Sequence, residues 1–205
     1  MRHGWIVLLL ASAGCVDLKA PYPERRFYTL EPLQKESSRS APDGTVLRVR
    51  RCTVSRAYEG SELVSRTGDA VYESDFYNAF FVPPATQITE QTHRWMGASK
   101  LFAHVVGGGS SIPETHVLEG HLLALYGDMR DHEKPAAVIE VQFMLVRVSS
   151  DPAVVVYQKS YREDIRLTKG EPEAFVKGWS DGLSNILTHL EADLSRAERA
   201  PNNRR

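Results

Sequence analysis

The segment "AAVIEVQFMLVRVSSDPAVVVYQKSYREDIRL" (136–167) contains two strand-like runs separated by an Asp-Pro turn. In the first run every second residue from Ile139 is large and apolar, and Glu140 and Gln142 stand between these positions. Side chains of a strand point to alternate faces, so the pattern predicts a half-buried antiparallel strand. The preceding segment "HVLEGHLLALYGD" (116–128) is also strand-like. We therefore expect three strands that follow one another as a meander.

Helical spacing marks two further segments. Apolar residues recur at helical intervals over 85–99, where the stripe is narrow. They form a clearer stripe from Phe175 to Leu194, within a helix predicted near 171–195. Pro172 lies near the start of that helix, where proline is favoured. These two segments are the main helices that the sequence predicts.

Shorter strand-like runs complete the domain. Their positions are 26–30, 45–56, a hairpin that turns at Gly68, and 101–106. The apolar face of the run at 45–56 changes near Arg50 and Arg51, which predicts a bulge or bend. The sum is a single α+β domain, in which two main helices pack on a mixed or mostly antiparallel sheet of about seven strands.

Composition narrows the class of protein. The chain has 205 residues, of which 42% are hydrophobic and 25% charged, a balance typical of one globular domain. The formal net charge is -1, so no basic field of the kind used to bind nucleic acid is expected. Local basic clusters such as "RVRR" (48–51) lack the accompanying motifs of nucleic-acid modules. We expect no nucleic-acid partner.

The N-terminal residues "MRHGWIVLLLASAGC" (1–15) have the pattern of a secretory signal: one arginine, a short apolar run and small residues before Cys15. The apolar run is shorter than the ~20 residues of a spanning helix. The ending "SAGC" resembles the bacterial lipobox, in which the cysteine thiol is acylated and becomes the mature N-terminus. A secreted protein with a stray cysteine is the alternative. The predicted divisions are a signal peptide (1–14), a lipidated tether (15–25), the domain (26–196) and a polar tail (197–205).

Two or three acyl chains on Cys15 would make membrane lipid a partner and hold the chain firmly. The residue after Cys15 is Val16 rather than Asp, and an Asp there tends to retain bacterial lipoproteins in the inner membrane. We therefore expect anchorage in the outer membrane, facing the periplasm. Cys52 would then have no disulfide partner, and a buried, reduced thiol is expected.

Motifs for catalysis or cofactors are weak. The run "GGGSS" (107–111) lacks the Gly-Lys-Ser/Thr and following helix of a phosphate-binding loop. The histidines are scattered, and no cysteine–histidine spacing of zinc type occurs. No Gly-x-Ser-x-Gly elbow occurs either. We predict no catalytic residue, no metal and no cofactor, and we expect that the protein is not an enzyme.

One short stretch is rich in aromatic residues. It contains Tyr72, Phe76, Tyr77, Phe80 and Phe81. Most of these side chains are expected in the core, because aromatic residues bury large areas. A hydrophobic contact surface for a partner or an acyl chain is the alternative interpretation.

Several segments together resemble a known family. They are "RFYTL", "YEGSELVSRTGDAVYESDFYNAFFVPP", "ITEQTHRWMGASKLF", "LEGHLLALYGDMRD" and "PAAVIEVQFMLV". This pattern is similar to the ABC-type transport auxiliary lipoproteins. That family supplies the lipoprotein component of MCE-type (mammalian cell entry) lipid transport systems, including the paraquat-inducible type. The resemblance covers nearly the whole mature chain and rests on no catalytic signature.

The resemblance implies a non-catalytic lipoprotein that docks at the outer-membrane end of a trans-envelope complex. Its partners would be an MCE-domain protein with an ABC permease and ATPase, and a homo-oligomeric ring is implied by the symmetry of such systems. Only Cys15 is carried over as a functional position. We take the exposed part of 72–81 and the glycines Gly107, Gly108 and Gly109 as candidate contacts with the partner.

Other classes remain open at the level of sequence. A periplasm-facing lipid carrier would need an internal apolar cavity. A lipoprotein of an outer-membrane assembly machine would copurify with that machine instead of a transporter. A periplasmic enzyme would gather His, Asp and Ser side chains in one pocket.

Overall fold

The computed structural model describes residues 24–34, 43–149 and 151–199. The predicted signal peptide, Cys15 and most of the predicted tether lie outside the described residues. In chain order, the elements are β1 (Arg26–Tyr28), β2 (Val46–Val49), β3 (Thr53–Val54), the 3-10 turn η1 (Arg56–Tyr58), β4 (Glu62–Arg66), β5 (Tyr72–Phe80), α1 (Pro84–Ser99), β6 (His104–Val106), β7 (His116–Asp128), β8 (Ala136–Arg147), β9 (Val154–Arg166) and α2 (Pro172–Arg199).

The nine described strands form one mixed sheet with β7 at its centre. β7 pairs antiparallel with β8 along its length, and β8 pairs antiparallel with β9, so the predicted meander is confirmed. Along its other edge β7 pairs in parallel with three short strands placed end to end, namely β2, β3 and β4. The antiparallel hairpin β4–β5 and the parallel pairs β1–β5 and β2–β6 complete the sheet.

The bend predicted near Arg50 separates β2 from β3. The Arg50 amide still donates to the Leu118 carbonyl of β7 at 3.0 Å. Two residues later, the Cys52 amide instead donates to the Thr89 hydroxyl of α1 at 2.8 Å. Because this amide leaves the ladder for a helix side chain, one predicted strand becomes two. The break contributes to a strand number above the expected seven.

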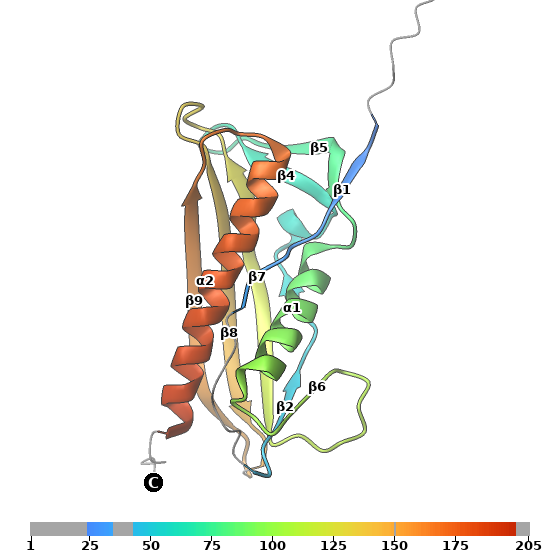
Figure 1. The fold of residues 1–205 in the computed structure, drawn as a ribbon, viewed down its shortest axis with the longest axis vertical. Coiled ribbons are helices and arrows are strands. Elements are labelled where there is room, and N and C mark those ends of the chain that lie inside the picture. Colours follow the sequence, from blue (N-terminus) through green and yellow to red (C-terminus); the bar gives the residue numbers. More distant parts are fainter. Residues whose placement is uncertain (1–23, 35–42, 150, 200–205) are drawn as a thin grey trace, which may run out of the picture.

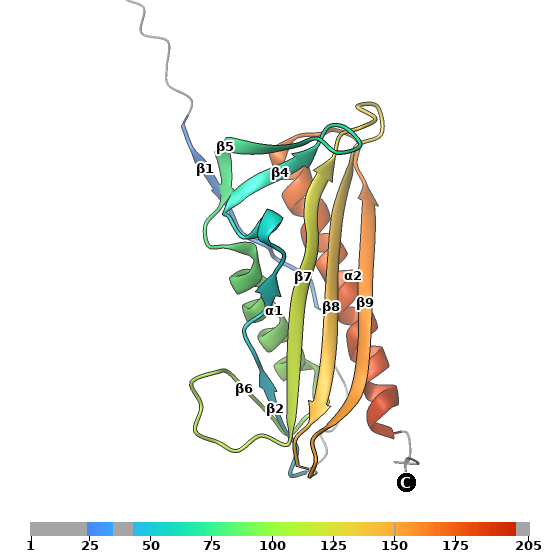
Figure 2. The same cartoon turned by 180° about the vertical axis from the view of Figure 1, so that it is seen from behind.

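The two helices cover one face of the sheet, with α2 against β8 and β9 and α1 beside it (Figures 1 and 2). The predicted stripe of α2 is buried, and Trp179 and Leu183 are fully enclosed. α2 continues to Arg199, past the predicted end near residue 195. Among the described residues, no helix is long and apolar enough to cross a membrane.

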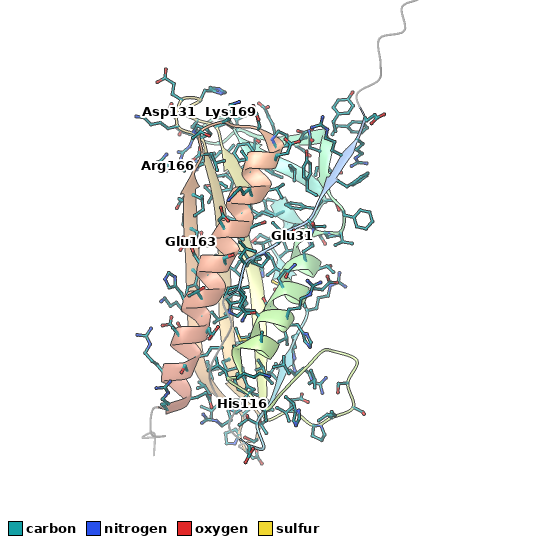
Figure 3. The ribbon with its side chains drawn as sticks, viewed as in Figure 1. Glu31, His116, Asp131, Glu163, Arg166 and Lys169 are labelled. Carbon is teal, nitrogen blue, oxygen red and sulfur yellow. The ribbon has the colours of Figure 1, made fainter. Side chains whose placement is uncertain are left out.

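The chain after β1 runs between the two helices (Figures 1 and 3). The Leu30 amide donates to Gln87 of α1 at 2.6 Å, and Gln91 donates to the Leu30 carbonyl at 2.7 Å. On the other side, the Glu31 amide donates to Ser180 of α2 at 3.1 Å. Leu30 itself is fully buried. These contacts fix the point where the chain enters the domain relative to both helices.

Two glycines let α2 lie close to the meander. A Cβ atom on Gly178 would stand 2.6 Å from the Cβ of Ala137 in β8. A Cβ atom on Gly182 would stand 2.8 Å from a methyl carbon of Ile139, two residues further along β8. Ala137 and Ile139 are completely buried, so neither can move aside into solvent. The helix therefore sits where only glycine fits.

We expect Gly178→Ala to lower the free energy of unfolding by about 1–3 kcal/mol, because overpacking against the Ala137 Cβ outweighs the gain in helix propensity. Gly97→Ala in α1 is the matched control. Gly97 is exposed and a Cβ there meets nothing within 4 Å, so the domain should gain roughly 0.5–1 kcal/mol. Urea unfolding of both variants measures the difference. Equal changes would show that α2 is not held at this close distance.

Candidate functional site

The aromatic stretch divides into buried and exposed residues. Phe80 is 2% exposed, and its ring lies 5.7 Å from that of Trp179. As a core residue Phe80 cannot contact a partner, which corrects its inclusion among the candidate contacts. Tyr72 joins a separate group at the start of β5, where its ring meets Tyr126 edge-on at 5.7 Å. The remaining exposed residues of the stretch are Phe76, Tyr77 and Phe81.

These three residues form a surface cluster with a fourth ring from β1. The exposed fractions are 54% for Phe27, 69% for Phe76, 43% for Tyr77 and 72% for Phe81. Phe27 meets Phe81 edge-on at 6.2 Å, and Phe76 meets Tyr77 edge-on at 5.2 Å. The Arg25 guanidinium lies 5.5 Å from the ring centres of both Phe27 and Phe76, linking the two pairs. We call Phe27, Phe76, Tyr77 and Phe81 the aromatic cluster.

A bulge in β5 presents half of this cluster. Glu62 of β4 pairs with Ala79, but the next residue, Leu63, pairs with Asp75, so β5 carries three extra residues (76–78). The Asp75 carboxylate accepts hydrogen bonds from the amides of Tyr77 and Asn78 at 2.9 and 3.0 Å. The backbone donors released by the bulge therefore have a partner. Bulges of this kind re-aim side chains, and here Phe76 and Tyr77 point away from the core.

The glycine segment lies in a loop (107–115) between β6 and β7 that Arg48 holds in place. The Arg48 guanidinium donates to the carbonyls of Gly107 (2.8 Å), Ser110 (3.2 Å) and Ile112 (2.9 Å). It also donates to the Glu114 carboxylate at 2.9 Å, which lowers the pKa of that carboxyl group. In the sequence Arg48 was only one member of a basic run. Its role as the anchor of this loop carries no local sequence signal.

The glycines at 107–109 are not required by sterics. A Cβ on any of the three would meet nothing within 4 Å, and none has a positive φ. A groove of about 420 Å³ lies between this segment and α1, with Arg51, Glu90, His93 and Arg94 among its lining residues. Side chains can therefore be added at the glycines without disturbing the core.

The two candidate contact regions lie at opposite ends of the long axis. β1 and β5, which carry the aromatic cluster, are at the upper end in both views, and the loop after β6 is at the lower end (Figures 1 and 2). The two regions cannot form one continuous surface, although the sequence placed both among the candidate contacts. The aromatic cluster and the loop at 107–115 therefore contact different neighbours, if both are contact regions.

A buried histidine lies near the lower end (Figure 3). The Nε2 atom of His116 accepts a hydrogen bond from Arg147 at 3.2 Å and lies 3.4 Å from the Glu198 carboxylate. Its Nδ1 atom is 2.8 Å from the Thr115 hydroxyl. Burial lowers the pKa of His116, Glu198 opposes this change and Arg147 adds to it. The neutral ring, protonated on Nδ1, fits these partners.

A polar group on β9 and α2 has the composition of a reactive cluster. The Asp193 carboxylate accepts hydrogen bonds from Tyr157 (2.5 Å), Tyr161 (2.7 Å) and Lys159 (3.0 Å), and it pairs with Arg196. Burial would raise the pKa of Asp193, but these bonds hold it well below its usual range. Burial, with the bond to Asp193, raises the pKa of Tyr157 to about 12. Every member is paired, so this group joins α2 to β9.

Two other sites bear on chemistry. A hollow of about 680 Å³ at the upper end is lined mainly by charged residues, among them Asp131 and Arg166 (Figure 3).

Burial raises the pKa of the free Cys52 thiol to about 12, so this side chain is a protonated thiol at neutral pH. Within 24–34, 43–149 and 151–199, no group of three or more His, Cys, Asp or Glu residues could hold a metal ion.

Solved structures share the fold. No family model and no curated protein matches the chain. A Xanthomonas campestris protein of family DUF330 aligns with 86% of this chain and 94% of its own, at 18% identity and a TM-score of 0.68. A second structure, described as an uncharacterized protein, covers 84% of this chain and 97% of its own, at 16% identity and a TM-score of 0.61. At these identities the likeness shows the fold alone.

We expect Arg48→Lys to loosen the loop at 107–115. A lysine ammonium cannot reach several carbonyls at once as the planar guanidinium does, so the free energy of unfolding should fall by about 1–2 kcal/mol. Arg51→Lys is the control, because Arg51 is an exposed neighbour in the same run. Hydrogen exchange of the loop amides should accelerate in Arg48→Lys alone. Unchanged exchange would show that Arg48 does not hold the loop.

We expect stability to fall as the pH drops below the usual histidine pKa of 6.5, because the folded pKa of His116 is lower. Between the folded and the unfolded pKa of His116, the unfolded chain binds more protons than the folded chain. The neutral His116 therefore contributes its full stabilisation above pH 6.5, and this stabilisation is lost as the pH falls to the lowered folded pKa. One proton sets a ceiling of about 1.4 kcal/mol per pH unit. Urea unfolding across this range should show a smaller slope in His116→Gln. An unchanged slope would contradict the assignment.

Proposed function

We propose that this protein is a non-catalytic accessory lipoprotein of an ABC/MCE-type lipid transport system. In this proposal, acyl chains on Cys15 anchor the chain in the outer membrane, and the domain faces the periplasm. It docks at the outer-membrane end of a trans-envelope complex formed by an MCE-domain protein with its permease and ATPase. ATP is hydrolysed by the partner, and the role of this chain is positional.

The observation that carries the proposal is how the domain is joined to its predicted anchor. Residues 30–31, which follow β1, are held by Gln87 and Gln91 of α1 and by Ser180 of α2. A chain anchored at Cys15 would therefore join the domain through a segment that is packed between the two helices, after the predicted tether. This arrangement suits a lipoprotein that positions a partner. The family resemblance of the sequence supplies the identity of that partner.

In this proposal the partner binds the lower end of the domain. Since the chain enters at the upper end, the loop at 107–115 lies on the side of the domain away from the predicted anchor (Figure 1). The loop is held by Arg48, and Gly107 and Gly108 line a groove against α1. A trans-envelope tunnel that approaches from the inner membrane would meet this end first. We therefore retain Gly107, Gly108 and Gly109 as partner contacts, and homo-oligomeric assembly as a ring is part of the same proposal.

A lipid carrier is the less well-supported alternative. The hollow of about 680 Å³ has a charged lining, which does not suit an acyl chain. A small void beside Cys52 and Phe143 measures about 10 Å³ and is too small for a lipid tail. The core beneath the helices is filled by side chains such as Trp179 and Phe143. These observations favour a docking role.

The test is a mild-detergent pull-down of the tagged protein from its own membranes, followed by mass spectrometry. We expect the MCE-domain protein, permease and ATPase. Gly108→Arg should reduce their recovery several-fold without lowering stability, because its side chain extends into open space. Ser160→Arg, at an exposed position of β9, is the control and should recover the complex normally. Recovery of an outer-membrane assembly machine, or of the protein alone with bound lipid, would overturn the proposal.

A further inference from the structure

The aromatic cluster is the largest exposed group of rings in the described part of the chain, and its geometry is specific. Two pairs of rings meet edge-on, and Arg25 lies over one ring of each pair. Contiguous exposed apolar surface of this kind marks a contact with another molecule or with a membrane. We therefore ask which molecule or membrane covers the aromatic cluster.

The fold holds these rings outward. Three extra residues in β5 (76–78) carry Phe76 and Tyr77, and Asp75 binds two amides of that bulge. Regular pairing with β4 would have left no such projection. Phe27 lies in β1 and Phe81 directly follows β5, and the Phe81 amide donates to the Tyr28 carbonyl at 2.8 Å. The cluster thus stands on paired backbone and is not a property of a loose loop.

The position of the cluster in the chain indicates that a membrane covers it. Arg25, in contact with two of the rings, is ten residues after Cys15 in the sequence. At no more than ~3.6 Å per residue, the Cα of Arg25 lies within about 36 Å of an acylated Cys15. The cluster therefore lies at the end of the domain where the chain from the anchor enters. This step rests on the lipidation of Cys15 in the proposed function.

The chemistry also fits a bilayer surface. Tyrosine and other amphipathic rings favour the level of the headgroups, and phenylalanine inserts its ring at the acyl boundary. Arg25 and Arg26 flank the cluster, but Glu62 pairs with the first at 3.4 Å and Glu173 with the second at 2.7 Å. With both cations paired, apolar contact supplies the main attraction. Salt should therefore have little effect on it.

We propose that Phe27, Phe76, Tyr77 and Phe81 rest in the headgroup region of the membrane leaflet that holds the acyl chains of Cys15. The domain then stands on its β1–β5 end, with the loop at 107–115 directed away from the membrane. The cluster acts as a second contact beside the lipid anchor. It sets the orientation of the domain, which a tether alone does not.

The test places a tryptophan in the cluster of the full, lipidated chain. The mature chain has only Trp95 and Trp179, both buried, so Phe76→Trp adds an exposed indole. The protein is reconstituted in vesicles of phosphatidylethanolamine and phosphatidylglycerol that contain phosphatidylcholine brominated near its headgroup. Ile112→Trp, exposed in the distant loop, is the matched control. We expect roughly threefold stronger bromine quenching for Phe76→Trp, at low and high salt alike.

Flotation of the vesicles separates the inference from its premise. A protein that floats but shows equal or no quenching at the two positions overturns the membrane contact and leaves the anchor intact. Protection of the Phe76→Trp indole from aqueous acrylamide only when the MCE-domain protein is added would assign the cluster to that partner instead. A protein that does not float overturns both the lipidation and the contact. Thermal unfolding of each variant confirms that it is folded.

Discussion

The pairing of β7 with β8 along their full length is the constraint on which the rest of the structure depends. Twelve residue pairs join the two strands, and at ~3.3 Å per residue such a ladder is about 40 Å long. The three short parallel strands pair with the other edge of β7, and α2 packs along β8 and β9. The length of this ladder separates the aromatic cluster from the loop at 107–115. One domain can therefore meet two different neighbours at its two ends.

The meander and the helices follow from the sequence because their signals are local. The alternation from Ile139 to Leu145 is reproduced in the burial of β8, and the stripe of α2 faces the sheet. The bend near Arg50 was also visible, as a change of apolar face. Its cause was not, because the Cys52 amide leaves the ladder for Thr89, a residue of a distant helix. Periodicity reveals that a strand is interrupted, but a long-range partner decides where.

The surface features could not be predicted in the same way. Strict alternation through 76–81 would place Phe76 and Phe80 on one face, yet the bulge leaves Phe76 exposed and Phe80 buried. The bulge depends on Asp75, whose side chain reads in sequence as any turn-forming carboxylate. Arg48 likewise gathers three carbonyls that lie 59 to 64 residues further along the chain. Such contacts exist only once the sheet has brought the segments together.

The exposed rings at the upper end give up burial free energy, which indicates a contact outside the isolated domain. Burying a phenylalanine side chain contributes about 1.5–3 kcal/mol, and Phe76 and Phe81 forgo most of this gain. A regular β5 would not need Asp75 to satisfy the amides of Tyr77 and Asn78, so the exposed arrangement has its own stabilising contact. Phe80, the residue before Phe81, is buried against Trp179, so the core at this end does contain ordered aromatic rings. A domain that both exposes these rings and fixes their backbone gains stability from them only when a second apolar phase covers them. The predicted anchor at Cys15 brings such a phase within reach.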